Sequence, residues 1–436
     1  MRLILLFTLF LSSTFTATAT DSLQQKINLH FQTTYIYQYK PAFNASYGAD
    51  HSILKDEEKQ NSLTATLYLG VRIWKGGQIY FNPEVAGGSG LSGAFGMAGS
   101  TNGETFRVGD PAPSLYIARA YFRQSFSLGN SYDTLQDQPN QLGGASDNRS
   151  FSVSAGKFSL GDFFDNNNYS NSPRTQFLNW ALMSNPAWDY AANLRGYTVG
   201  AIAMLKYDRT SYKLGLAALP EVANGAKLNT KIGIARGINA EINRNYKIKG
   251  QEGNIRLLGY YNQTNMGLYS QALTTINSNN RPDVVLTEKN GRTKTGFGIN
   301  ADQKLNNWLA LFARVGWNDG KTETWAFTEA DRTFSLGLSL NGMKWKREND
   351  NFGAAIVMNG ISKEHRNYLA AGGYGFQLGD GKLSYGNEAV TELFYSYKPM
   401  NAGIWFSGDY QFALNPGYNE DRGPVNVFSF RLHIEI

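Results

Sequence analysis

The sequence predicts an all-β fold, a transmembrane antiparallel β-barrel with a short helix in one loop. Three observations lead to this prediction. Apolar and polar residues alternate with period two along many segments, glycine-rich turns join neighbouring segments, and longer polar stretches separate the resulting pairs. Many segments exceed the five or six residues that are usual for strands of soluble proteins. At about 10 residues per strand, the chain has room for about 16 to 18 strands.

The N-terminus has the pattern of a secretion signal. Arg2 precedes an apolar run from Leu3 to Leu11, and Ala17-x-Ala19 suits signal-peptidase cleavage. The apolar run is about half of the roughly 20 residues that a membrane-spanning helix needs. We therefore expect residues 1–19 to be a signal peptide and residues 20–436 to form the barrel.

The strand pattern is clearest in residues 62–74, SLTATLYLGVRIW, whose apolar side chains share one face of an extended chain. The glycine turn at 75–77 leads into a second alternating segment, which predicts a hairpin. The last residues, 428–436 (FSFRLHIEI), alternate to the very end. We expect them to pair with residues 27–39 and to close the barrel, because an open sheet edge is not tolerated in lipid.

Longer polar stretches lie between these hairpins and fit outer or inward-folded loops, namely residues 40–61, 86–113, 130–148 and 268–292. Short turns that alternate with long loops are typical of outer-membrane barrels.

One region, residues 172–184, breaks the alternation and predicts a helix. Ser172 suits the N-cap, Pro173 suits the first helical position, and Asn185-Pro186 ends the pattern. A helix has no place in a barrel wall. The segment therefore either folds inward and narrows the pore or caps the rim of the barrel.

Composition excludes several classes of function. The chain has no cysteine and only four scattered histidines, so a structural zinc site is not expected. The net charge of +6 comes without a basic run or basic helix, which argues against a nucleic-acid partner. The glycines at 88–93 lack the helix that a dinucleotide site needs, and DNNNYS from Asp165 lacks the glycine and glutamate of a calcium loop. We expect no cofactor and no metal ion.

The polar faces of the predicted strands supply candidates for a pore lining. An arginine facing lipid at mid-bilayer would cost about 2–4 kcal/mol, so these side chains are expected to face the lumen. Sugars are bound by such mixtures of hydrogen-bonding groups and aromatic faces, although the same residues also serve simply to solvate a barrel interior. The candidate substrate-binding residues are Arg72, Trp74, Glu84, Arg119, Tyr121, Arg123, Arg314 and Asp409.

These segments resemble the carbohydrate-selective porins of the OprB family over nearly all of the mature chain. The resemblance implies a 16-stranded outer-membrane barrel that admits sugars by passive, selective diffusion. Ile436 departs from the Phe or Trp on which such barrels commonly end, so recognition by the barrel-assembly machinery is expected to be altered in efficiency. The motifs that carry the resemblance include "YFNPEVAGGSGLSGAFGMAGSTNGE", "GKFSLGDFFDNNNYSNSPRTQFLNWAL", "WDYAANLRGYT", "FARVGWNDGKTETWAFTEADRTFSLGLSLNG" and "DYQFALNPGYNEDRGPVNVFSFRLHIEI".

Four functions follow as hypotheses. The first is a porin of the bacterial outer membrane for glucose and related sugars, with outer-membrane lipids, lipopolysaccharide and the assembly machinery as further partners and a homo-oligomer as a possible assembly. The second is a channel for anions or organic acids, suggested by the basic charge. The third is a barrel enzyme such as a glycosidase or lipase. Asp162 with Asp165 or Glu84 with Glu104 could be imagined as its carboxylate pair, but sequence alone does not set their separation, and we expect no enzyme. The fourth is a soluble lectin or adhesin.

Overall fold

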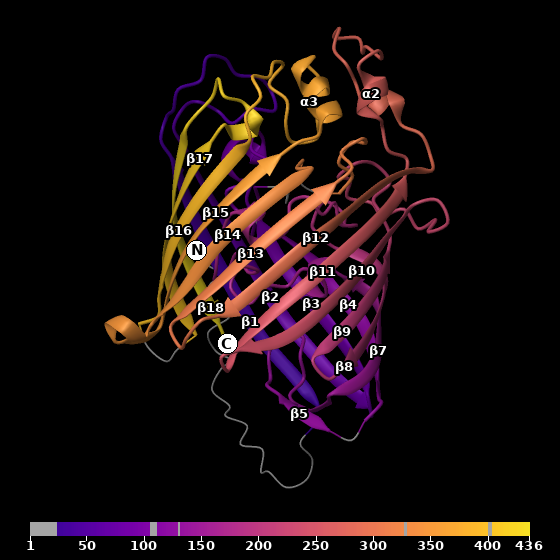
Figure 1. Cartoon of the computed structure of the whole chain (residues 1–436), viewed down its shortest axis with the longest axis vertical. Coiled ribbons are helices and arrows are strands. Elements are labelled where there is room, and N and C mark those ends of the chain that lie inside the picture. The colour runs from indigo at the N-terminus through magenta and orange to yellow at the C-terminus, as the bar shows by residue number, and fades with distance from the viewer. Residues whose placement is uncertain (1–23, 105–110, 130, 327–328, 400–402) are drawn as a thin grey trace.

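The computed structural model describes residues 24–436 except 105–110, 130, 327–328 and 400–402. The predicted signal peptide, residues 1–19, lies outside the described residues. Sixteen antiparallel strands form one closed barrel, in the order β1-β18-β17-β16-β15-β14-β13-β12-β11-β10-β9-β8-β7-β4-β3-β2 (Figure 1). The predicted fold class is therefore confirmed.

The barrel strands follow the alternating segments of the sequence. They are β1 (Ile27–Lys40), β2 (Glu58–Trp74), β3 (Gly77–Gly87), β4 (Ser114–Ser127), β7 (Arg149–Phe158), β8 (Thr198–Tyr207), β9 (Thr210–Ala217), β10 (Arg236–Ile248), β11 (Gln251–Thr264), β12 (Arg292–Lys304), β13 (Leu309–Asn318), β14 (Arg332–Gly342), β15 (Arg347–Gly360), β16 (Glu388–Tyr397), β17 (Ile404–Leu414) and β18 (Val425–Glu435). A separate two-stranded sheet consists of β5 (Tyr132–Leu135) and β6 (Gly144–Asp147).

The barrel closes where the sequence predicts. β18 pairs with β1 in a register that places Phe430 opposite Tyr37 and Phe428 opposite Tyr39. Phe428 and Phe430 are 47% and 45% exposed on the outer wall, whereas Arg431 is buried inside. The period-two alternation thus separates a lipid-facing surface from a polar interior.

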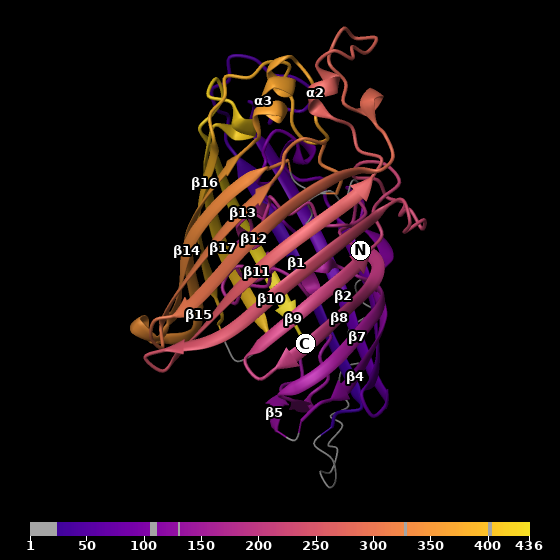
Figure 2. The ribbon, with the colours of Figure 1, turned by 45° about the vertical axis from the view of Figure 1, so that its right-hand side comes forward.

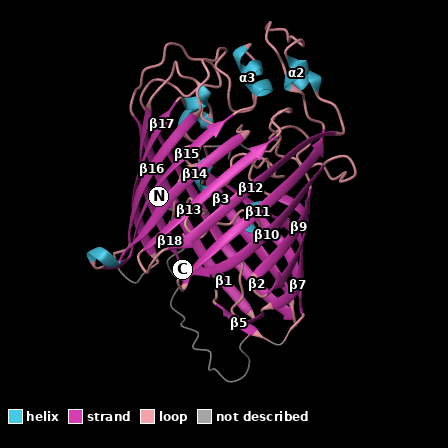
Figure 3. Cartoon of the chain, in the orientation of Figure 1, coloured by secondary structure: helices cyan, strands magenta, loops and turns pink. Residues whose placement is uncertain are grey.

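The two ends of the barrel differ. Short turns join the strands at the end where the C-terminus lies, and long loops with helices crowd the other end (Figure 3). By the asymmetry of outer-membrane barrels, the short-turn end faces the periplasm and the long-loop end faces the exterior. Three of the four predicted long loops lie at the long-loop end.

The fourth predicted loop, residues 130–148, is described from residue 131 on. This part lies at the short-turn end, because β4 runs toward that end. It contains the β5–β6 sheet, seen at the bottom of Figure 1. The side chain of Asn28 on β1 donates to the carbonyl of Gln138 at 2.9 Å, and Nε2 of His30 lies 3.0 Å from Oδ1 of Asp137. The connection is therefore docked against the inside of β1.

The helices are short and lie in the connections. The α-helices are α1 (Trp180–Met183), α2 (Tyr269–Ala272) and α3 (Lys363–Ala370), and the 3-10 turns are η1 (Leu91–Ala94), η2 (Leu160–Asp162), η3 (Val285–Thr287), η4 (Met343–Trp345) and η5 (Pro416–Tyr418). Figure 2 shows α2 and α3 at the same, long-loop end of the barrel. Within the described residues, no helix is both long enough and apolar enough to cross a membrane.

The helix predicted for residues 172–184 exists only in its last part. Ser172 begins an isolated turn, in which its carbonyl accepts from the amide of Gln176 at 2.8 Å. The α-helix starts after Asn179, whose side chain caps the amide of Ala181 at 3.0 Å. The predicted start is wrong because Glu392 of β16 binds the amides of Leu178 and Asn179, which holds the intervening backbone outside a helix.

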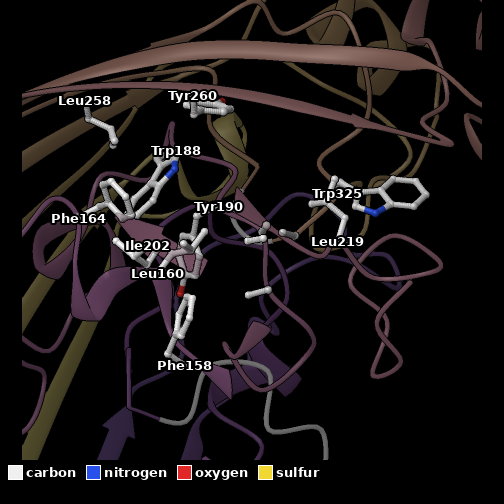
Figure 4. Close-up of a cluster of buried hydrophobic side chains, with 14 of the residues drawn as sticks. Phe158, Leu160, Phe164, Trp188, Tyr190, Ile202, Leu219, Leu258, Tyr260 and Trp325 are labelled. Atoms are coloured by element: carbon white, nitrogen blue, oxygen red, sulfur yellow. The ribbon is translucent and has the colours of Figure 1, made fainter. Parts of the chain in front are cut away.

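Apolar side chains fill part of the barrel interior. Figure 4 shows Phe158, Phe164, Trp188 and Tyr190 gathered around the connection between β7 and β8. The rings of Trp188 and Tyr190 lie 4.9 Å apart, and those of Phe164 and Trp188 lie 6.2 Å apart edge to face. This packing makes the interior a shaped passage and not an open tube.

Candidate functional site

Residues 159–197, between β7 and β8, fold into the barrel and are called the inward segment below. The carboxylate of Glu392 on β16 accepts from the amides of Leu178 and Asn179 at 2.6 and 2.8 Å. Arg314 on β13 donates to the carbonyl of Leu182 at 2.7 Å. These two wall strands, β13 and β16, lie on the opposite side of the barrel from β7 and β8. The inward segment therefore crosses the lumen and narrows it. Of the two alternatives that the sequence left open, the structure shows the inward fold and not the cap on the rim.

Buried charges of the wall hold the inward segment in place. Nε of Arg314 lies 3.2 Å from Oδ2 of Asp165, which also accepts from the amide of Asn185 at 2.9 Å. On the neighbouring side, Asp409 pairs with Arg431 at 3.3 Å, and Arg431 donates to the carbonyl of Gln176 at 2.8 Å.

Arg314 and Asp409, two predicted substrate-binding residues, are thus committed to anchoring the segment. Both side chains are buried, and neither borders the cavity described next, as far as the structure describes the chain. Their inward orientation follows from the strand alternation, but alternation cannot reveal that a loop covers them.

A cavity of about 320 Å³ lies between the inward segment and the wall formed by β1 to β4. This volume is within the range of about 300–1,000 Å³ that small-molecule pockets occupy. Of the predicted residues, Glu84 and Arg119 line it. The wall adds Gln32, Tyr68 and Tyr116, the loop after β3 adds Glu104, and the inward segment adds residues that include Asp162, Asp165, Arg174, Trp180, Trp188, Tyr190, Arg195 and Tyr197.

Arg174 of the inward segment joins two carboxylates across the cavity. Its Nη2 lies 3.1 Å from Oε2 of Glu84, and its Nε lies 2.6 Å from Oε1 of Glu104. Glu84 also accepts from the hydroxyl of Tyr197 at 3.0 Å and from that of Thr66 at 2.5 Å. Arg174 thereby fixes both carboxylates in orientation and offsets one of their two negative charges.

A second guanidinium–carboxylate pair lies in the same cavity. Arg119 on β4 binds Asp162 through two parallel hydrogen bonds, of 2.7 Å from Nε and 2.6 Å from Nη2. Its guanidinium also lies over the ring of Tyr197, 5.4 Å from the centroid. Two parallel hydrogen bonds hold the planar groups rigidly, so this side of the passage has a defined width.

Arg195 differs from these arginines because no described residue offers it a carboxylate. Its guanidinium stacks on the ring of Tyr116 at 4.2 Å and donates to the hydroxyl of Ser114 at 2.8 Å. Nη1 is buried and has no hydrogen-bond partner among the described residues. Other atoms of Arg195 border the cavity, so this cation can meet a solute without competition from a neighbouring carboxylate.

Aromatic faces complete the cavity. Trp180 and Tyr190 are stacked, with centroids 6.3 Å apart and planes inclined by 20°. Their rings and those of Trp188 line the cavity beside the ion pairs. Flat apolar surfaces next to hydrogen-bonding groups suit a ligand that has both hydroxyl groups and C–H faces.

Three other predicted residues, Tyr121, Arg123 and Arg72, point into the barrel away from this cavity. Tyr121 stacks on Tyr80 at 5.0 Å, and Arg123 lies over Tyr80 at 5.5 Å while Nε donates to the hydroxyl of Ser154 at 3.1 Å. Nε of Arg72 donates to the carbonyl of Gln25 at 3.0 Å. These three predicted residues do not border the cavity in the part of the chain that the structure describes.

Trp74 lies on the outer wall, so its predicted place in the lumen is wrong. A β-bulge between Arg72 and Trp74 shifts the alternation by one residue. The ring is 57% exposed and lies 5.8 Å from that of Phe122, which pairs with the outward-facing Ile79. Trp74 therefore belongs with the aromatic residues at the membrane interface.

Sequence reasoning missed Arg174 and Arg195, because both come from a connection and not from a strand. Only one signal could have found them, the concentration of charged and aromatic residues in a segment that breaks the strand pattern. Among the residues that the structure describes, no group of three or more His, Asp or Glu side chains could hold a metal ion.

Comparisons with known proteins agree with this geometry. A family model described as "Carbohydrate-selective porin, OprB family" matches residues 50–436. The high-pH structure of Pseudomonas putida OprB is similar, with a TM-score of 0.72 and 16% identity over 94% of each chain. The outer membrane channel DcaP of Acinetobacter baumannii has a TM-score of 0.52 and 11% identity, over 96% of this chain and 100% of that one. No curated protein matches the sequence. The structural similarities concern the fold alone.

Proposed function

The chain belongs to the carbohydrate-selective porin family OprB, and from this premise we propose that neutral sugars bind in the cavity between the inward segment and the wall. The protein is a carbohydrate porin of the bacterial outer membrane. Arg119, Glu84, Arg174 and Arg195 are the hydrogen-bonding side of this sugar site, and Trp180 and Tyr190 are its apolar side.

The charge balance of the cavity is the observation that carries this proposal. Four carboxylates line the cavity, against three guanidinium groups, so positive charge is not in excess. One of these four carboxylates, that of Asp165, is paired with Arg314, which lies behind the lining of the cavity. A channel for organic anions would favour an excess of cations at its narrowest part. The basic net charge of the chain therefore does not argue for the anion-channel alternative.

The ion pairs also bear on the enzyme hypothesis. A glycosidase needs two carboxyl groups that flank the scissile bond of its substrate. Glu84 and Glu104 instead both bind the guanidinium of Arg174, which lies between them where a substrate would have to enter. We infer that these groups orient a passing sugar and do not transfer protons to it.

Arg195→Ala tests the sugar site directly. Hydrogen bonds from charged groups contribute about 1.5–3 kcal/mol, so we expect the variant to weaken block of ion current by glucose about tenfold or more. Single-channel current in planar bilayers, titrated with glucose, measures the dissociation constant.

Arg149→Ala is the matched control. Arg149 is exposed at the short-turn end, where it pairs with Asp208 at 3.0 Å, and its loss should leave glucose block unchanged. An unaltered glucose affinity in the Arg195 variant would remove that residue from the proposed site.

A further inference from the structure

The outer wall of the barrel has a hollow of about 770 Å³ that is separate from the lumen. Its lining comes from the long-loop ends of β12 to β15 and includes Arg366 of α3. Figure 2 shows α3 among the loops at that end of the barrel. The lining of the hollow combines outward apolar side chains with two arginines, Arg332 and Arg366.

Strand register builds the apolar floor of this hollow. Phe334 pairs with Val315 on one side and with Met358 on the other, while Phe297 pairs with Trp317. These five side chains point outward and are 38–49% exposed. The rings of Phe297 and Trp317 lie 5.7 Å apart. The floor is thus a continuous apolar surface at the height of acyl chains.

Gly360 makes room at the top of the hollow. It pairs with Arg332 across β14 and β15, so a side chain at this position would point outward beside the guanidinium. A Cβ there would lie 3.0 Å from Oδ1 of Asn387 and 3.2 Å from the hydroxyl of Tyr385. The glycine lets these two residues lie over the end of the strand and leaves space next to Arg332.

Two arginines without carboxylate partners border this space. Arg332 is exposed and pairs with outward-facing Trp317, and Arg366 of α3 lies over the ring of Tyr385, 3.6 Å from the centroid. No ion pair involves either guanidinium among the described residues. By contrast, the rim arginine at the short-turn end of β15, Arg347, pairs with Asp350 at 2.5 Å.

The position of the arginines indicates which anion would suit them. They lie at the long-loop end, where the headgroups of the outer leaflet meet the barrel. A guanidinium binds phosphate through two parallel hydrogen bonds. We propose that the hollow binds a phosphorylated lipid of the outer leaflet, with its phosphate on Arg332 and Arg366 and its acyl chains on Phe334 and its neighbours.

Native mass spectrometry of the purified, folded barrel with bisphosphorylated lipid A tests this proposal. We expect Arg332→Glu and the double variant with Arg366→Glu to weaken lipid A binding at least tenfold. Lipid A stripped of its phosphates should bind the wild type at least tenfold more weakly than the intact lipid does. Arg332 is exposed, so its single variant is expected to fold, and the mobility shift between unheated and boiled samples on gels verifies the barrel.

Lys231→Glu is the matched control, because Lys231 is an exposed cation of the same membrane side in the loop between β9 and β10. It should bind lipid A as the wild type does. Equal affinity of wild type and Arg332→Glu would overturn the proposal, as would equally tight binding of a phosphorylated glucosamine without acyl chains. A double variant that keeps lipid affinity but loses an oligomer would instead assign the hollow to contact between copies, and would overturn it too.

Discussion

At the scale of single residues, paired charges define the passage for sugars. Arg174 bridges Glu84 and Glu104, and Arg119 binds Asp162. With Arg195, which also lines the cavity, three guanidinium groups face these three carboxylates. The passage therefore offers strong hydrogen-bond donors and acceptors without a field that favours ions of one sign.

Removal of the bridging arginine should reveal this balance. Arg174→Ala leaves Glu84 and Glu104 without their guanidinium, and we expect the channel to gain a preference for cations. The reversal potential in a KCl gradient measures the change, which should be largest at low salt, where screening is weak.

Arg149→Ala, remote from the cavity, should leave the reversal potential unchanged. A reversal potential of Arg174→Ala equal to that of the wild type would mean that the two glutamates do not control the ion path.

At the scale of elements, strands were predictable and the residues that fill the barrel were not. The alternation of residues 62–74 and 428–436 reflects one wet and one lipid-facing surface, a constraint local to each strand. The prediction that a helix begins at Ser172 was wrong. Glu392, more than 200 residues away in sequence, binds the backbone amides of Leu178 and Asn179. The prediction that Trp74 faces the lumen was wrong because a β-bulge turns its side chain to the outer wall. Contacts of this kind leave no periodic signal in the sequence.

The long-loop elements are held together by a buried histidine of α3. Nδ1 of His365 lies 3.2 Å from Oδ2 of Asp331, Nε2 lies 3.7 Å from Oε1 of Glu329, and the ring of Tyr269 stacks on the imidazole at 4.3 Å. Burial opposes the charge of His365, but Asp331 and Glu329 prevail and raise its pKa from 6.5 to about 9. The imidazolium therefore links three separate loops.

This link should weaken in alkaline solution. A raised pKa means that the stabilisation is fully present below pH 6.5 and is lost as the pH rises through about 9. Hydrogen exchange of the α3 amides, corrected for intrinsic rates, should show lower protection at pH 10 than at pH 7. In His365→Ala, protection should already be low at pH 7 and should depend less on pH. Constant protection of the wild type from pH 6 to pH 10 would contradict the role given to this histidine.

At the scale of the whole molecule, a closed barrel becomes selective because a folded segment narrows its interior. The barrel strands from β1 to β18 pair in a closed ring, so no sheet edge is open to lipid. The inward segment is bound to one side of the wall, for example through Arg314, and leaves a cavity on the other side. The family membership establishes a carbohydrate porin. Removal of residues 1–19, contact with the assembly machinery and a homo-oligomer stay predictions.

Single-channel current tests the central claim, selectivity for neutral sugars in the cavity, most directly. Purified protein in planar bilayers is titrated with glucose, a disaccharide and gluconate at two salt concentrations. We predict saturable block by glucose whose affinity is nearly independent of salt, since a neutral ligand is not screened. Block by gluconate alone, which strengthens at low salt together with a preference for anions, would contradict the account.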